Sequence, residues 1–258
     1  MDYSKEFRDL IACTKDTEDF IGYGNPNAKI LIIGKEESFD IEKEESLDMG
    51  KEDDNIIYNQ ASKGNWKGWE EVIGNPSITP DSIPVWKDSG KFCPLYPWKG
   101  DDLPKGTWTN YQKLINRLYR EADAGKMTTF HQYAFITEFN DLPSKKSKRK
   151  DPEVQQRITH RCKNVLNHPF YKSFPIVIAA CGHYVKDYNI NLEDIFNQKY
   201  IEPESVKIET GEWINIHRKD NRILIHTRQL SNSFSPDLIK CIANHILSLS
   251  KSLKKDNL

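Results

Sequence analysis

Apolar residues form four short runs along the chain that predict buried strands. The runs cover residues 29–33, 133–137, 175–180 and 222–226. Each run is almost continuously apolar, and each is followed by a polar or glycine-containing turn. Strands of this kind are typical of a parallel sheet that is covered on both faces.

Helical spacing of apolar residues appears between and after these runs. It covers residues 109–124, 152–166 and 236–249. Asp151 and Ser235 each precede a proline, which is the pattern of an N-cap followed by proline in the first helical turn. Strands that alternate with helices predict a layered α/β fold. Residues 213–217 and 222–226 flank a polar tetrapeptide and predict a β-hairpin.

Two neighbouring segments differ from this pattern. Residues 35–54 are strongly acidic, and residues 58–98 are aromatic and rich in Gly and Pro. We interpret them as a long insertion after the first strand. The prediction is a single domain over residues 1–258 with an insertion at about 40–105.

Composition excludes several classes of protein. The longest apolar runs, 30–33 and 176–181, are far too short to cross a bilayer, and the first residues lack the apolar core of a secretory signal. The five cysteines include no C-x-x-C pair, which disfavours a disulfide framework or a zinc ribbon. We therefore expect a cytoplasmic protein without membrane contact. The oligomeric state is left open.

Charge adds one constraint. The 37 Lys and Arg residues balance 38 Asp and Glu residues, so nucleic-acid binding requires a local basic patch. Such a patch is present at Lys145, Lys146, Lys148 and Arg149, and basic residues continue to Lys163. The first part of this stretch, Lys145 to Arg149, is the candidate for phosphate contacts. The alternative is a solvated loop.

Polar residues follow the first and last strands, where parallel sheets bind ligands. Gly34 would let a ligand approach the backbone closely, and Glu36 could orient a water molecule as a general base. The alternative is a solvated acidic loop. His226 could donate a hydrogen bond to a developing anion, and Arg228 could contact a phosphate. The alternative for His226 is a structural role at a strand end.

Aromatic residues near the first strand are candidates for stacking on a base, and Phe39 is the one closest to Gly34. The alternative is that these rings belong to the core, as is common for aromatic side chains.

The order of these features resembles the uracil-DNA glycosylase superfamily, most closely its bacterial and archaeal iron–sulfur branch. The segments that carry the resemblance are residues 22–34, 135–143, 157–166 with 175–182, and 226–231 before 235–238. The resemblance covers most of the chain outside the insertion. It implies a three-layer α/β/α sandwich around a mainly parallel four-stranded sheet. It also implies a flipped base that is cleaved at its N-glycosidic bond.

The resemblance assigns roles to individual residues. His226 would stabilise the departing base anion, and Glu36 would position the attacking water. Glu138 stands where a base-reading Asn is expected. An ionised carboxylate only accepts hydrogen bonds, so a base with an exocyclic amine would suit it better than uracil.

Only Cys13 and Cys162 match cysteine positions of the iron–sulfur branch. Two thiolates cannot hold a four-iron cluster. We predict no iron–sulfur cluster, no other metal and no cofactor.

Two hypotheses follow. The chain is either a glycosylase with altered base preference, as in DNA repair, or a catalytically inactive module that binds nucleic acid or a nucleotide on the same fold. In both, the expected partner is DNA or a nucleotide.

Overall fold

The computed structural model describes residues 3–17, 19–36, 66, 94–95, 106–119, 128–142, 149–231 and 235–255. Its centre is a seven-stranded mixed sheet with the order β1-β3-β2-β4-β7-β6-β5. The strands are β1 (Tyr23–Gly24), β2 (Ile30–Gly34), β3 (Ala134–Glu138), β4 (Ile176–Ala179), β5 (Lys199–Lys207), β6 (Trp213–Lys219) and β7 (Arg222–Thr227).

Four neighbouring strands, β3, β2, β4 and β7, run parallel to one another. They are the four strands predicted from apolar runs. The predicted hairpin is also confirmed, because β6 pairs antiparallel with β7. The prediction of a four-stranded sheet is wrong, since β1 is added antiparallel at one edge and β6 and β5 are added at the other.

Side chains on the parallel strands alternate between two apolar cores, because successive residues of a strand point to opposite faces. Leu31, Ile33 and Leu224 belong to one core, and Ile30 and Ile225 to the other. Both sets are fully buried. This explains why the strands read as continuous apolar runs in the sequence.

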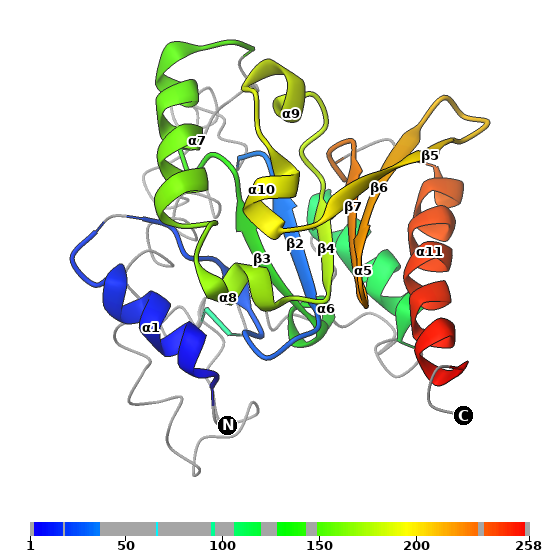
Figure 1. Cartoon of the computed structure of the whole chain (residues 1–258), viewed down its shortest axis with the longest axis horizontal. Helices are drawn as coiled ribbons and strands as arrows, with labels where there is room; N and C mark the ends of the chain where they lie inside the picture. The colour runs from blue at the N-terminus through cyan, green and yellow to red at the C-terminus, as the bar shows by residue number, and fades with distance from the viewer. Residues whose placement is uncertain are drawn as a thin grey trace, which may run out of the picture.

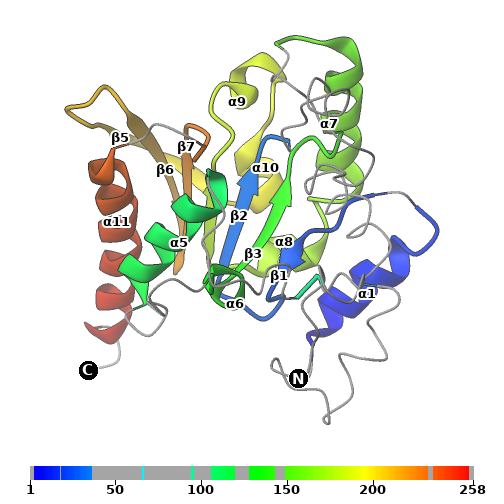
Figure 2. The same ribbon diagram turned by 180° about the vertical axis from the view of Figure 1, so that it is seen from behind.

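Helices cover both faces of the sheet. One face, in front in Figure 1, carries α1 (Lys5–Cys13), α7 (Pro152–Asn164), α8 (Pro169–Ser173), α9 (Tyr184–Asp187) and α10 (Leu192–Phe196). The other face, in front in Figure 2, carries α5 (Thr107–Leu118), α6 (Phe130–Tyr133) and α11 (Pro236–Lys255). The predicted α/β class with helices on both faces is therefore confirmed.

Both predicted helix starts are present. The Asp151 side chain accepts hydrogen bonds from the backbone N–H groups of Glu153 and Val154 at the start of α7. The Ser235 hydroxyl accepts one from the N–H of Leu238 at the start of α11. Each cap satisfies donors that the first helical turn leaves unpaired.

Most of the predicted insertion lies outside the described residues, with Trp66, Pro94 and Leu95 as the exceptions. The Trp66 indole N–H donates to the Gly22 carbonyl at 2.7 Å, and the Pro94 carbonyl accepts from the Gly24 N–H at 2.7 Å. These contacts join parts of the insertion to the β1 end of the sheet. No helix in the described part of the chain is long and apolar enough to cross a membrane.

Candidate functional site

The carboxyl ends of the four parallel strands meet along one side of the sheet, towards which the arrows of β2 and β3 point in Figure 2. We call this side the carboxyl edge; it comprises residues 34–36, 138–140, 180–184 and 226–228. Backbone hydrogen bonds hold its loops together. The Asn140 N–H donates to the Lys35 carbonyl at 2.7 Å, and the Gly182 N–H donates to the Thr227 carbonyl at 2.9 Å.

Glu36 is held inside this edge. Only 6% of the residue is exposed, and its carboxylate accepts a short hydrogen bond from the hydroxyl of Tyr184, which is fully buried. Because Tyr184 begins α9, directly after β4, this contact ties the end of β2 to the end of β4. Glu36 is thus a positioned carboxylate, which does not fit the alternative of a solvated acidic loop.

His226 lies near the end of β7 and is also buried. Its Nε2 is 2.9 Å from the Gly182 carbonyl oxygen, and its Nδ1 is 3.4 Å from the amide nitrogen of Asn215. Since a carbonyl only accepts, Nε2 carries the hydrogen and Nδ1 accepts from Asn215. Burial lowers the pKa of His226 to about 4, so the ring is neutral at pH 7.

Gly34 and Glu138 face each other at the ends of β2 and β3, where the two residues are paired in register. A Cβ atom on residue 34 would overlap the Glu138 carboxylate in its present position, so the glycine allows this carboxylate to lie against the backbone of β2. Glu138 is buried, and its carbonyl oxygen accepts from Arg161 Nε at 3.0 Å. Gly34 and Glu138, which were both predicted to contact a base, therefore lie side by side.

A row of ionisable groups along the same edge was not found from the sequence. Lys35 is 7% exposed, its Nζ is 3.4 Å from His183 Nδ1, and it lies 5.3 Å from the centre of the Tyr184 ring. His183 Nε2 is 3.6 Å from a carboxylate oxygen of Asp187. The signal that could have found this row was the pair His183 and Asp187, spaced by four residues directly after a predicted strand.

Two predicted phosphate contacts lie near this edge, each with an acidic neighbour. The exposed Arg149 donates to both oxygens of Asp187, at 2.7 and 3.0 Å. Arg228 lies 3.5 Å from Glu212 and is 41% exposed. The other predicted site residues, Phe39, Lys145, Lys146 and Lys148, lie outside the described residues.

Arginines in the later part of the basic stretch have a structural role. Arg161 is fully buried and lies 3.0 Å from Asp141, and Arg157 contacts both Asp141 and Asp19. Burial alone would raise the pKa of Asp141, but the two guanidinium groups outweigh it and hold that pKa well below its usual range. These arginines neutralise buried acids.

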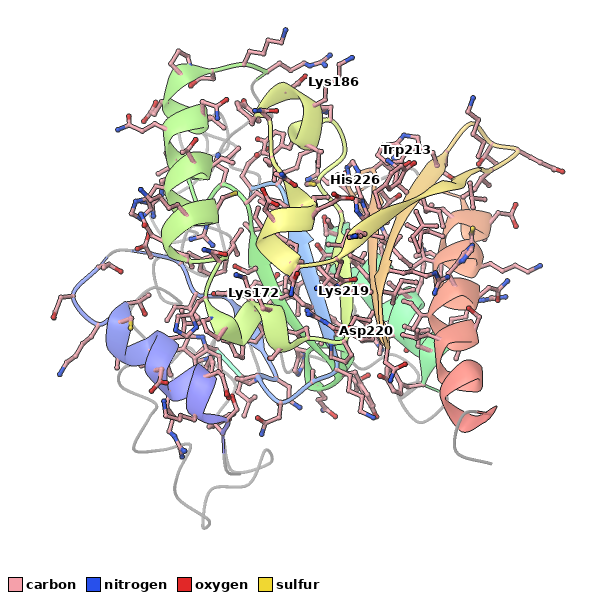
Figure 3. The ribbon with its side chains drawn as sticks, in the orientation of Figure 1. Lys172, Lys186, Trp213, Lys219, Asp220 and His226 are labelled. Atoms are coloured by element: carbon pink, nitrogen blue, oxygen red, sulfur yellow. The ribbon has the colours of Figure 1, made fainter. Side chains whose placement is uncertain are left out.

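A groove of about 450 Å³ lies beside His226. Its lining residues are Lys207, Ile208, Gly211, Trp213 and Asn215. The Trp213 ring packs edge-on against His226, with ring centres 4.8 Å apart and planes at 74°. Figure 3 shows both side chains at the end of the hairpin that is remote from Lys219 and Asp220. The partly exposed Trp213 is an aromatic residue that the sequence-based search for stacking did not select.

A second cavity of about 310 Å³ lies along α7 and the segment from Tyr188 to Ile195, and no residue of the carboxyl edge lines it. Cys162 does, and burial raises the pKa of its thiol to about 12. Within the described ranges, no three His, Cys, Asp or Glu side chains are grouped as metal ligands.

Comparisons with family models, with curated proteins and with solved structures find no match to this chain. The function of this chain is therefore inferred from the residues of the carboxyl edge.

Proposed function

We propose that this protein binds a nucleobase-bearing ligand, a nucleotide or a DNA strand, at the carboxyl edge of a uracil-DNA glycosylase-like fold. One observation carries the proposal. The loop of residues 182–184 makes a hydrogen bond to Glu36 through Tyr184 and another to His226 through Gly182. Two residues that are 190 positions apart thus face one loop at the side of the sheet where α/β proteins bind ligands.

The chemistry of this edge suits a nucleobase. The Glu138 carboxylate can accept hydrogen bonds from an exocyclic amine, which adenine, guanine and cytosine carry and uracil lacks. The indole of Trp213 offers an aromatic surface beside His226 for stacking. Arg149 and Arg228 supply positive charge near the same edge for a phosphate.

The state of His226 favours binding over catalysis. A histidine that stabilises a departing base must donate a hydrogen bond to it. Here the Nε2–H group already donates to Gly182, and Nδ1 accepts from Asn215. His226 therefore serves to fix the loop of residues 182–184 in place.

Hydrolysis of an N-glycosidic bond is the second candidate, and the position of Glu36 favours it. The Tyr184 hydroxyl orients this buried carboxylate at the end of β2. A carboxylate held in one orientation is what activation of a water molecule requires. In this case the contact between His226 and Gly182 would have to open when substrate binds.

Binding and base release should be measured on the same oligonucleotides. The probes are single-stranded and duplex DNA containing normal bases, uracil or hypoxanthine, and free nucleotides. We expect salt-dependent binding and no base release. Glu138→Gln should weaken binding of amine-bearing bases about tenfold, because one charge-assisted hydrogen bond is lost.

Asp220→Asn is the matched control for this experiment. It removes one carboxylate at the β6–β7 turn, and residue 220 has a positive φ of 53°, which Asn tolerates. Binding should be unchanged in this variant. Absence of binding to every probe would overturn the proposal. Base release that is lost in Glu36→Gln would establish the second candidate instead.

A further inference from the structure

The row Lys35, His183 and Asp187 has the order of an activated nucleophile, with an ion-pair distance and no hydrogen bond between His183 and Asp187. In such an arrangement the nucleophile contacts a base, and a third group orients the base. Lys35 Nζ is 3.4 Å from His183 Nδ1, and the other ring nitrogen of His183 is 3.6 Å from Asp187. Arg149 fixes Asp187 through two hydrogen bonds.

The surroundings of Lys35 favour a neutral amine. Burial lowers its pKa, although Glu36 and Asp187 oppose that shift. Burial and the positive charge of Lys35 also lower the pKa of His183, which favours the neutral ring. The fully buried Tyr184 ring and the buried Cys181 thiol also lie near the amine. A lysine used only as a surface charge would not be enclosed in this way.

We propose that Lys35 is a nucleophile that forms an imine with an aldehyde substrate at the carboxyl edge, with His183 as its proton acceptor. The identity of the aldehyde rests on the proposed function. In a DNA strand, the aldehyde is the ring-opened C1′ carbonyl of a sugar that has lost its base. The proposal thus assigns an abasic nucleotide as the ligand class.

The reaction requires no oxidant or reductant. His183 takes a proton from the Lys35 ammonium group, and the neutral amine attacks the aldehyde carbon. The new C–N bond forms as the C=O π bond opens to an alkoxide, and one of the two protons on the attacking nitrogen passes to this alkoxide to give a hydroxyl group. Protonated His183 then donates to this hydroxyl, which leaves as water, and loss of the remaining N–H proton yields the neutral imine. Asp187 stabilises the imidazolium while it carries the proton.

Imine formation can be tested by reduction with cyanoborohydride, which converts the imine into a stable secondary amine. The full-length protein is incubated with a single-stranded oligonucleotide that contains one abasic site, and the adduct is located by peptide mass mapping. Lys35→Arg should lower the adduct yield at least about twentyfold, because arginine forms no such imine. Lys186→Arg, on the exposed surface of α9 (Figure 3), is the matched control and should keep the wild-type yield.

His183→Asn tests whether His183 accepts the proton of Lys35. The adduct should form more slowly, and the pH at which its rate is half-maximal should move upwards, because Lys35 loses its proton acceptor. A merely structural contact would leave this pH profile in place. Circular dichroism of each variant verifies that it is folded.

Two further probes separate this proposal from the proposed function. An oligonucleotide with a tetrahydrofuran abasic analogue has no aldehyde and reports binding alone. Glycolaldehyde with the wild-type protein reports the reactivity of Lys35 without DNA. Binding of the analogue without any adduct at Lys35 overturns the nucleophile. If no oligonucleotide binds, preferential labelling of Lys35 by glycolaldehyde supports the nucleophile and removes DNA as its substrate, and labelling no greater than that of Lys186 overturns it.

Discussion

At the scale of single residues, neighbouring groups determine what each polar side chain of the carboxyl edge can do. His226 has both ring nitrogens in contact with hydrogen-bonding partners, one a carbonyl and one an amide. Glu36 has an oriented donor in Tyr184. The same residue types in an exposed loop would be solvated and free to reorient. The difference lies in contacts between residues that are distant in sequence.

The buried, neutral state of His226 makes stability depend on pH. Its pKa is lowered to about 4 in the folded protein, against about 6.5 when unfolded. The contribution of neutral His226 to the free energy of unfolding is therefore present above pH 6.5 and is lost as the pH falls towards 4. Between pH 7 and pH 5, we expect the free energy of unfolding to fall by on the order of 2 kcal/mol from this group.

Urea denaturation of the wild-type protein and of His226→Gln at both pH values measures this effect. The variant should lose this part of the pH dependence, because glutamine does not titrate. An equal pH dependence in the two proteins would contradict the assignment.

Trp213 allows a second test at this scale. If a base stacks on its indole, Trp213→Ala should weaken nucleotide or DNA binding by about 1–3 kcal/mol, and Trp213→Phe should retain most of it. The dissociation constants of the three proteins decide the question. Equal affinities would assign Trp213 to packing against His226 alone.

At the scale of elements, the sheet depends on close approaches that only glycine permits. Gly22 has a φ of 134°, and a Cβ there would overlap the Ile136 carbonyl oxygen and the Phe135 ring of β3. The two-residue strand β1 can pair with β3 only because this overlap is absent. The Gly22 carbonyl oxygen also accepts the hydrogen bond from the Trp66 indole N–H.

Gly22→Ala should therefore destabilise the protein by at least about 3 kcal/mol, through strain and overpacking combined. Gly211→Ala is the matched control, because residue 211 also has a positive φ, of 81°, but has open space around it. It should cost about 1–2 kcal/mol, the penalty of the backbone conformation alone. Thermal unfolding of both variants measures the difference. Equal losses would contradict the role given to the contact with β3.

At the scale of the whole molecule, a buried ion cluster joins segments that are distant in sequence. Arg161, on α7, donates to the Phe20 carbonyl at 2.9 Å, to the Glu138 carbonyl at 3.0 Å and to the Asp141 carboxylate at 3.0 Å. It thereby connects the segment before β1, the end of β3 and α7. The position of Glu138 at the candidate site depends on this cluster.

Arg161→Met should destabilise the protein by about 3–5 kcal/mol, because it leaves the buried Asp141 without one of its two guanidinium partners. Lys5→Met removes the cation of a pair with Asp9 in which both side chains are exposed, and it should leave the urea midpoint nearly unchanged. Denaturation of both variants at pH 7 is the measurement. A similar loss in both would show that burial of the pair does not matter.

Much of the framework could be predicted from the sequence. The four parallel strands, the hairpin and the two capped helices follow from local periodicity and from caps, which act within a few residues. The missed strands have weak local signals. β1 has two residues, and β5 contains Pro203, which an edge strand tolerates. Their pairing depends on neighbours that lie elsewhere in the chain.

Local sequence patterns were enough to predict that β2, β3, β4 and β7 are buried strands and that Glu36, Glu138 and His226 stand at or just beyond strand ends. The environment of these side chains became visible only in the folded chain. It includes the hydrogen bonds of His226, the Tyr184 contact that orients Glu36, and the contact of Lys35 with His183, 148 positions away in the sequence. The physical reason is the range of the interactions involved. Side-chain periodicity and capping are local, whereas burial, charge pairing and hydrogen-bond partners arise when distant segments pack together.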